Sequence, residues 1–343
     1  MRPERARPGV LRTGWSRILL AVPACAAWLG AVGCFQPVQR PVPSGLDLYM
    51  PVPAENPLRQ DVVALGRALF FEQALSRDSS LACASCHRPS EGFSDGRRLS
   101  QGVFGRQGAR NVPTILNRGY GRSFFWDGRI STLEEQVLQP IMAADEMDMS
   151  VEEAVERLRR NPEYVAAFRR IFERMPNEKD LARSLASYVR TLRTGDSRFD
   201  RFVDGDRGAL SELEVRGQQL FQGKARCVRC HMGATFTDER FHNTGVAWRE
   251  GELHDLGRYT VSGAEVDRGA FKTPTLRQVA KTAPYMHDGS LATLEAVLDF
   301  YDGGGNDNPY QDPLIRSLGL DEDERAALVA FLGSLTGVVR EGI

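Results

Sequence analysis

Two short stretches of the sequence combine cysteine and histidine in an order that attaches haem. Cys83-Ala84-Ser85-Cys86-His87 and Cys227-Val228-Arg229-Cys230-His231 each have two residues between their cysteines and a histidine directly after the second. The two thiols of such a pentad add across the vinyl groups of a porphyrin, and the histidine ligates the iron. A zinc site built from the two cysteine pairs is the alternative, but zinc needs no histidine after each pair. We therefore expect two covalently bound c-type haems.

The bulk composition fits two ordinary domains and excludes one class of partner. The chain has 343 residues, a formal net charge of -1 and 26% charged residues. That length is enough for about two domains, each with its own hydrophobic core. Because positive charge is not in excess and the body has no long basic run, we expect no nucleic-acid partner.

Residues 1–33 have the pattern of an export signal. Five arginines precede residue 18, and an apolar run follows from residue 18 to residue 32. The run is short for a membrane span and Pro23 interrupts it, so a retained helix is the weaker interpretation. Ala31-Val32-Gly33-Cys34 resembles a lipoprotein cleavage box, which leaves a lipid anchor at Cys34 open. With Cys25 inside the signal, no cysteine pair remains for a disulfide, and we expect a periplasmic protein whose cysteines bind haem.

The body of the chain has the periodicity of helices and no clear alternation of strands. Residues 34–58 are rich in proline, which predicts an extended tether, with order beginning near Arg59. Apolar residues then recur at helical spacing, and Ser150 with Glu153 has the pattern of a capping box. The expected helices cover residues 61–71, 150–160, 181–192, 213–221, 294–301 and 321–335. We expect a mainly α protein with long loops.

An internal repeat relates the two halves of the chain. Each half contains Gly-x-x-Leu-Phe, a haem pentad, Pro-Thr and Asp-Gly-x-x-x-Thr-Leu-Glu, in that order. The aspartate of the Asp-Gly pair, Asp127 or Asp288, lies 14 residues after the proline in both halves. Such a repeat indicates two tandem cytochrome c-type haem domains. We place the first domain at residues 59–205 and the second at 206–343.

Where the aligned halves differ, the two haems have different surroundings. Trp126 aligns with His287, and Pro140 aligns with Tyr301. Tyr301 carries a phenol oxygen that can ligate iron, whereas Pro140 has no atom to offer. A buried core aromatic is the alternative role for Tyr301. As a ligand, it would leave the first iron to activate a small oxidant and the second mainly to store or pass electrons.

Together these motifs resemble the bacterial di-haem cytochrome c peroxidase family, whose relatives include the MauG-type enzymes. The resemblance extends over about residues 57–337. The stretches that carry it are the two haem pentads, Arg110-Asn111-Val112-Pro113-Thr114, Phe125-Trp126-Asp127-Gly128-Arg129, Phe241-His242-Asn243 and Ala283-Pro284-Tyr285-Met286-His287-Asp288-Gly289.

The resemblance implies roles for residues around the two haems. It makes His87 the proximal ligand of a peroxidatic haem and His231 that of an electron-transferring haem. Trp126 matches the tryptophan between the haems, and Gln136 and Glu146 match residues of the peroxide pocket. A carboxylate there can take a proton from one peroxide oxygen and return it to the other. The residues alone leave two alternatives, a core indole for the tryptophan and a solvated charge for the glutamate.

The resemblance also implies a calcium ion between the domains. Asn111, Thr282 and Pro284 match its ligands, which would offer one side-chain oxygen and two backbone carbonyls, as a hard cation prefers. Of the remaining histidines, we expect His242 near a haem edge or propionate without a ligand role, and His254 simply exposed.

Two departures separate this chain from the family members that need reductive activation. Those members carry a histidine that blocks the first haem, in the loop before the Arg-Asn motif, but residues 88–110 contain none. We therefore expect a first iron that is open in the oxidised protein. Tyr301 stands where methionine is usual, as in the MauG-type arrangement, and an anionic oxygen ligand gives the second haem a low reduction potential.

Three functions fit this pattern. The first is a periplasmic peroxidase that reduces hydrogen peroxide with electrons from a small cytochrome c or a blue-copper protein. The second, which Tyr301 favours, is a MauG-like oxidase that modifies a partner protein. The third is a non-enzymatic di-haem electron-transfer lipoprotein, and Gln136 and Glu146 argue against it. The natural donor and the choice between monomer and homodimer stay open.

Overall fold

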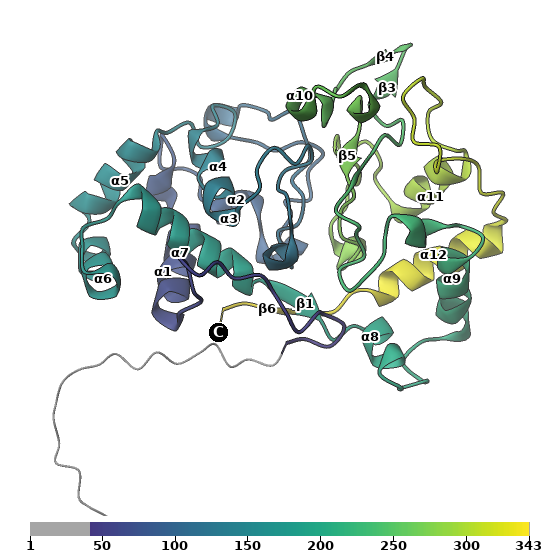
Figure 1. Ribbon diagram of the computed structural model, residues 1–343, viewed down its shortest axis with the longest axis horizontal. Helices are drawn as coiled ribbons and strands as arrows, with labels where there is room; N and C mark the ends of the chain where they lie inside the picture. The colour runs from purple at the N-terminus through teal and green to yellow at the C-terminus, as the bar shows by residue number, and fades with distance from the viewer. Residues whose placement is uncertain (1–41, 343) are drawn as a thin grey trace, which may run out of the picture. The chain divides into compact units, whose positions relative to one another are not determined.

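Two packed pairs of helices organise residues 42–342, the part of the chain that the computed structural model describes. In the first half, α1 (Gln60–Phe70) packs along α7 (Glu178–Thr191). In the second half, α9 (Glu212–Gln222) packs along α12 (Glu322–Ser334), as Figure 1 shows. The spacing of apolar residues predicts all four helices, and the structure confirms them.

A glycine lets the helices of each pair approach closely. A Cβ atom added to Gly66 would lie 1.9 Å from the carbonyl oxygen of Ser184, and one added to Gly217 would lie 2.0 Å from that of Ala327. Both glycines open the Gly-x-x-Leu-Phe motif of the repeat. Because the two backbones touch at these points, a larger residue has no room there.

Most of the other α-helices lie, along the chain, between the two members of one pair. α5 (Val151–Arg160) begins where the Ser150 hydroxyl accepts a hydrogen bond from the Glu153 amide, as its sequence predicts. The Glu153 carboxylate pairs with Arg77 and Arg157, so the second bond of the expected capping box is replaced by ion pairs. The remaining helices are α2 (Cys83–Cys86), α3 (Leu133–Gln136), α4 (Gln139–Met142), α6 (Pro162–Phe172), α8 (Arg198–Val203), α10 (Tyr259–Ser262) and α11 (Leu294–Asp302).

Short antiparallel strand pairs occur in the described residues, two of them between separate parts of the chain and one within a local hairpin. The pairs are β1 (Arg193–Gly195) with β6 (Val338–Arg340), β2 (Phe241–His242) with β5 (Phe271–Lys272), and β3 (Trp248–Arg249) with β4 (Glu252–Leu253). The β1–β6 pair connects the first half to the end of the second. These strands have two or three residues each, which is too short for the alternation that marks a strand in sequence.

The internal repeat is visible in the backbone. Asn117 and its aligned residue Gln278 have φ values of 60° and 64°, and Phe125 and its aligned residue Met286 have values of 66° and 72°. Positive φ is uncommon for residues other than glycine. Its recurrence at aligned positions supports the duplication that the motifs indicate.

Residues 42–58 belong to the stretch that is expected to form an extended tether, and they contact the body of the protein. The Gly45 carbonyl accepts a hydrogen bond of 2.6 Å from Arg277. The Ser44 amide donates to the Asp196 carboxylate at 2.8 Å, and the Ser44 carbonyl accepts from the Asp196 amide at 2.9 Å. Order begins before Arg59, because polar groups of the body, far away in sequence, bind the extended backbone.

Each half has its own hydrophobic core. One core contains Leu69 and Tyr188, and the other contains Phe221 and Phe331. Within residues 42–342, none of the helices is both long enough and apolar enough to cross a membrane. The expected export signal and Cys34 lie outside the described residues.

Candidate functional site

Each haem pentad holds its histidine in a form that can bind iron. The Nδ1–H of His87 donates to the carbonyl oxygen of Phe93, and that of His231 donates to the carbonyl oxygen of Phe236, both at 3.0 Å. Because a carbonyl only accepts, Nε2 is left as the basic nitrogen of both rings. Burial lowers the pKa of both imidazoles, which favours the neutral ring that a metal requires.

One cavity of about 900 Å³ extends past both pentads. Its walls are mostly hydrophobic, and it is large and apolar as a porphyrin site must be. The pentad residues in its wall are Cys86, His87, Cys227, Cys230 and His231, and Cys83 lines a smaller pocket that shares Cys86 and His87. Thiols and imidazoles from both pentads thus face this space, and the donor set fits two c-type haems.

Near the first pentad, the cavity wall carries groups that can move protons. Gln136 at the end of α3 and Glu146 in the loop after α4 line it together with Pro140. Burial raises the pKa of Glu146 to about 7, with Asp145 adding to the shift and Arg129 opposing it. A carboxyl group with a pKa near neutrality can both accept and donate a proton.

Near the second pentad, the wall has different chemistry. Tyr301 on α11 lines the cavity close to Cys227 and Cys230. Burial raises the pKa of its phenol, so in the absence of a metal the oxygen keeps its proton. Val297 lines the cavity at the position that the repeat aligns with Gln136. The second pocket therefore presents a phenol oxygen, whereas the first presents an amide and a carboxyl group.

The two halves meet through a pair of equivalent hydrogen bonds. The Asn111 amide donates to the His287 carbonyl at 2.7 Å, and the Lys272 amide donates to the Trp126 carbonyl at 2.8 Å. The repeat aligns Asn111 with Lys272 and Trp126 with His287. The same bond is thus made once from each half, as in a two-fold symmetric interface.

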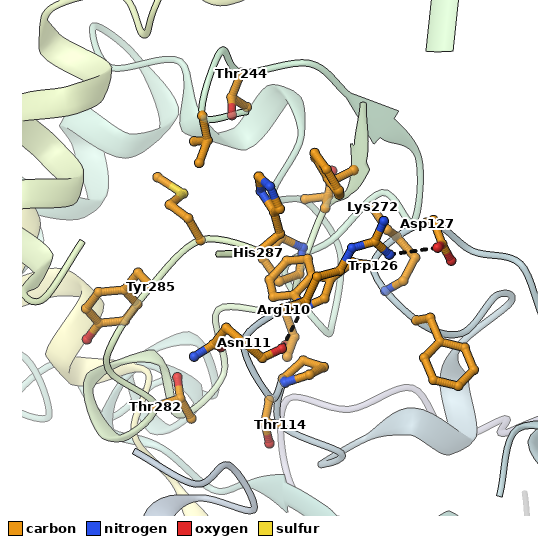
Figure 2. A pocket seen from close by; sticks show the side chains of 18 of the residues that line it. Arg110, Asn111, Thr114, Trp126, Asp127, Thr244, Lys272, Thr282, Tyr285 and His287 are labelled. Carbon is orange, nitrogen blue, oxygen red and sulfur yellow. Dashed lines mark hydrogen bonds and ion pairs between the residues drawn. The ribbon is translucent and has the colours of Figure 1, made fainter. Parts of the chain in front are cut away.

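Two ring systems are fixed at this contact. The indole N–H of Trp126 donates to the Asn111 carbonyl at 2.9 Å, a bond marked in Figure 2. The His287 ring stacks on Phe271, with the ring centroids 3.6 Å apart and the planes at 11°. Burial lowers the pKa of His287 to about 4, so this imidazole is neutral. Both rings line the shared cavity.

Arg110 ties the halves together beside these rings. It donates to Asp127 of the first half at 2.7 Å and makes two bonds, of 2.8 and 2.9 Å, to Asp255 of the second half. The pair with Asp127 is also drawn in Figure 2. A bidentate contact of this kind fixes orientation as well as distance. Arg110 belongs to one of the family's sequence motifs, but Asp255 is far away in the chain, and no sequence pattern indicated their contact.

A second charged cluster at the contact was not predicted. Glu239 lies 2.7 Å from Arg118 and 3.6 Å from Lys272. Burial lowers the pKa of Lys272 to about 7, with Arg118 adding to the shift and Glu239 opposing it. Burial would raise the pKa of Glu239, but Arg118 and Lys272 bring it down to about 2. In the sequence, the one feature that pointed to this cluster is the alignment of Lys272 with Asn111.

The two remaining histidines differ in their surroundings. Both ring nitrogens of His242 contact carboxylates, Nδ1 that of Asp312 at 2.6 Å and Nε2 that of Asp238 at 3.0 Å. The ring lines the cavity, and both of its nitrogens are taken up by these carboxylates. Asp238 and His242 also lie close enough to Cys230 to form a candidate metal site, but a haem would occupy that sulfur. His254 is half exposed and also lines the cavity, so its expected role as a purely exposed side chain is incomplete.

The three residues expected to bind calcium all line the cavity. They are Asn111, Thr282 and Pro284. The Asn111 amide nitrogen donates to the carbonyl oxygens of Arg97 and Arg98, at 2.8 and 3.4 Å. Its amide oxygen is therefore available as a ligand atom.

Comparisons with known proteins agree with this geometry. Residues 60–208 match the family described as "Di-haem cytochrome c peroxidase", and residues 214–336 match the family "Cytochrome c". The chain is 43% identical to the methylamine utilization protein MauG of Methylorubrum extorquens, over 83% of this chain and 81% of that protein. It is 38% identical to the cytochrome-c peroxidase IdrP1 of Denitromonas iodatirespirans, over 93% of this chain and 92% of that protein.

A solved structure has the same fold over most of its length. It is that of a MauG-like protein associated with microbial copper homeostasis, with a TM-score of 0.79 and 32% sequence identity. The match covers 91% of this chain and 96% of the other. With two haem domains in tandem and relatives of this similarity, the chain belongs to the di-haem cytochrome c peroxidase family of oxidoreductases, which includes the MauG proteins.

Proposed function

We propose that this protein reduces hydrogen peroxide to water with electrons from a small redox protein, either a c-type cytochrome or a blue-copper protein. Each peroxide molecule takes up two electrons and two protons and yields two water molecules. The observation that carries the proposal is the asymmetry of the two pockets. Gln136 and Glu146 supply proton-transfer groups to the first, whereas Tyr301 supplies an iron ligand to the second.

In this proposal each pentad binds one haem. Cys83, Cys86 and His87 hold the first haem, and Cys227, Cys230 and His231 hold the second. When bound, the first haem would supply an iron that can bind peroxide, and the second would store and relay electrons. The support is the hydrogen bond that leaves Nε2 of His87 and of His231 free for a metal.

Glu146 moves the proton. Its carboxylate takes a proton from one peroxide oxygen and returns it to the other, which leaves as water. A pKa of about 7 keeps both forms of the side chain populated at neutral pH. Gln136 lines the same part of the cavity, and its amide, which can donate and accept, orients the peroxide beside Glu146.

Trp126 passes electrons between the two haem sites. Its indole lies at the contact between the halves, in the wall of the cavity that both pentads share. The Asn111 carbonyl that accepts its N–H is not a base. The indole therefore keeps its proton when it gives up an electron, and the transfer needs no proton movement.

Tyr301 closes the second site, while the first stays open. Pro140, which the repeat aligns with Tyr301, offers no ligand atom. The segment that carries a blocking histidine in other members, residues 88–110, has none in this chain. With haem bound, the first site would therefore react with peroxide without prior reduction, and the Tyr301 oxygen would give the second haem a low potential.

Asn111, Thr282 and Pro284 bind a calcium ion at the contact between the halves. The support is that all three line the cavity and that the Asn111 amide oxygen is available. Calcium takes six to eight oxygen ligands, so water completes the shell. Binding would rigidify the backbone of Asn111, which holds both Trp126 and His287.

The protein acts in the periplasm. The export pattern in residues 1–33 supports this location, and c-type haem fits an exported protein. Cys34 is the candidate site of a lipid anchor, which mass spectrometry of the mature amino terminus would detect. Light scattering of the haem-loaded protein would distinguish a monomer from a homodimer.

The first experiment is a pair of spectra. Optical and electron-spin-resonance spectra of the oxidised, haem-loaded protein are recorded before and after one equivalent of hydrogen peroxide, without reductant. One high-spin and one low-spin haem, both changed promptly by peroxide, support the proposal. Two low-spin haems without a reaction would overturn it. Sustained oxidation of a reduced c-type cytochrome or blue-copper protein then tests turnover.

A second candidate function is oxidation of side chains on a partner protein, as a MauG-like enzyme. Tyr301 in the second pocket and the 43% identity to a MauG protein favour it. The rate at which the protein oxidises an electron donor distinguishes the two functions. Rapid, sustained donor oxidation supports the peroxidase. A peroxide-oxidised state that persists in the presence of reduced donors supports the oxidase.

A further inference from the structure

A short hairpin, residues 100–108, lines the first haem pocket. The Gly108 amide donates to the Ser100 carbonyl at 3.0 Å, and the Gly102 amide donates to the Arg106 carbonyl at 2.7 Å. Ser100 and Gly108 belong to the same cavity wall as Glu146. The hairpin lies within the segment in which the absence of histidine leaves the first iron open, but its own contacts give it a further role.

The hairpin backbone lies directly against the segment 143–148, which carries Glu146. A Cβ atom added to Gly102 would lie 2.2 Å from the Asp145 carbonyl oxygen and 2.7 Å from that of Glu146. The φ of Gly102 is -88°, which any residue adopts. Glycine is therefore needed here for space and not for backbone conformation. In addition, the Val103 amide donates to the Glu146 carbonyl at 2.8 Å.

A side chain fastens the same contact from the hairpin tip. Nη1 of Arg106 donates to the Ala144 carbonyl at 2.7 Å and to the Asp148 carboxylate at 2.9 Å. These two partners flank Glu146 on both sides in sequence. The backbone of Glu146 is thus held at its own carbonyl and at residues before and after it, all by one hairpin.

We propose that Gly102, Val103 and Arg106 are positioning residues, which hold the Glu146 carboxyl group in the first haem pocket. The inference rests on the proposed role of Glu146 in peroxide cleavage. None of the three touches peroxide in this proposal, since each acts through the backbone of the 143–148 segment. A displacement of about 1 Å at a proton-transfer group can lower a rate by up to about a hundredfold.

The position of the carboxyl group also sets its acidity. Glu146 owes its raised pKa first to burial, and the charged neighbours that act on it are Asp145 and Arg129. A shift of the 143–148 segment away from the hairpin would admit water to the carboxyl group. The pKa of Glu146 would then fall towards the ordinary value of a glutamate.

The test compares two glycine substitutions in one hairpin. Gly102→Ala places a methyl group against the 143–148 backbone. Gly105→Ala is the matched control, because a Cβ there would meet only the end of the Gln101 side chain, at 3.9 Å. Gly105 has a φ of +72°, so the control strains the hairpin turn without touching the Glu146 segment.

Two measurements on the haem-loaded variants decide between the roles. Hydrogen exchange followed by mass spectrometry reports the two segments separately. Gly102→Ala should raise exchange in residues 100–108 and 143–148, and Gly105→Ala in residues 100–108 alone. The second-order rate constant for peroxide should fall about tenfold in Gly102→Ala, with its acid limb moved about one pH unit lower. In Gly105→Ala both should stay at the wild-type values.

A second pair of variants keeps the inference testable if Gly102→Ala fails to fold. Arg106→Gln removes the contacts to Ala144 and Asp148, and Arg106→Lys retains the charge and one donor group. We expect Arg106→Gln to lower the rate constant several-fold and Arg106→Lys to restore most of it. The spin-state spectrum of the oxidised protein should be the same in both.

The outcomes separate this inference from the proposed function. A wild-type rate in Glu146→Gln would overturn the role of Glu146 and, with it, the inference. A slow Glu146→Gln variant combined with a wild-type rate and acid limb in Gly102→Ala and Arg106→Gln would overturn the positioning role alone. A rate loss in Arg106→Gln that Arg106→Lys does not relieve would also count against it.

Discussion

The two haem pockets of this protein share one scaffold and differ in a few side chains. Both have a histidine that donates its Nδ1–H to a backbone carbonyl at 3.0 Å, and both rest on a helix pair packed through a glycine. The first pocket then has Gln136 where the second has Val297, and Pro140 where the second has Tyr301. Duplication preserved the means of holding a haem, and substitutions at aligned positions of α3, α4 and α11 contribute to the difference between the two sites.

The contact between the halves is likewise symmetric in its backbone and asymmetric in its side chains. Equivalent backbone bonds from Asn111 and Lys272 join the halves, so the backbone keeps the symmetry of the duplication. The side chains break it, with an indole at Trp126 and a neutral imidazole at His287. A direction for electron flow between two similar sites can arise only from such differences.

The largest expected effect falls on the first pocket alone. Glu146→Gln should lower the rate constant for peroxide by about 10²- to 10⁴-fold, because general acid–base catalysis contributes that much. In the wild type, the rate should fall as the pH drops through about 7, since the reactive form is the carboxylate and burial raises the pKa of Glu146 to about 7. Stopped-flow spectroscopy over a pH series measures both.

Asp145→Asn is the control for this comparison. Asp145 is adjacent and exposed, and its charge raises the pKa of Glu146 less than burial does. The variant should keep the wild-type rate, with its acid limb moved to slightly lower pH. If Glu146→Gln and Asp145→Asn lowered the rate constant equally, the negative charge near the pocket would matter, and the carboxyl group of Glu146 would have no special role.

Tyr301→Phe should make the two pockets more alike. It removes the phenol oxygen but keeps the buried ring, so the second haem loses its proposed ligand and gains an open position. Cyanide titration of the oxidised protein should then rise from about one to about two molecules bound per chain, on the premise that an open ferric haem binds one anion. One cyanide per chain in both proteins would rule out Tyr301 as the ligand.

The shared scaffold should respond equally in both halves. Gly66→Ala and Gly217→Ala each force a methyl group into a backbone carbonyl, and we expect a loss of about 1–3 kcal/mol in the free energy of unfolding for each. Gly333→Ala on α12 is the control, because a Cβ there meets no atom within 4 Å. It should be neutral or stabilising by up to about 1 kcal/mol. Thermal and denaturant unfolding measure all three.

The smallest effects should come from two aligned helix caps. The hydroxyl of Thr132 accepts the Glu135 amide at the start of α3, and that of Thr293 accepts the Ala296 amide at the start of α11. Alanine at either position should cost about 1 kcal/mol of stability. The haem spectra of the two variants should differ, because Thr132→Ala loosens the helix that carries Gln136 of the first pocket. Thr293→Ala loosens the helix that carries Tyr301 of the second. Thr293→Ala is expected to weaken the signal of the second haem alone, and a change in both haems would contradict separate pockets.

Local features were predictable from the sequence, and contacts over long separations were not. The pentads around His87 and His231, the helices and the repeat depend on residues close in the chain. The contact of Arg110 with Asp255 spans 145 positions, and no local pattern records it. The ion pair of Glu239 with Arg118 could not be predicted for the same reason. The prolines of residues 42–58 predict an extended backbone, but they do not indicate which groups bind it.

Strand β6 has a consequence for how the protein is made. Its partner β1 ends at Gly195, whereas β6 begins at Val338, so the first half cannot close its edge until the second half has been synthesised. The hydrogen bond from the Tyr188 hydroxyl to Glu341 forms equally late. The core of the first half consists of residues between Val62 and Leu192 and can form earlier, so we expect the pairing of β1 with β6 to be the last step in the assembly of this half.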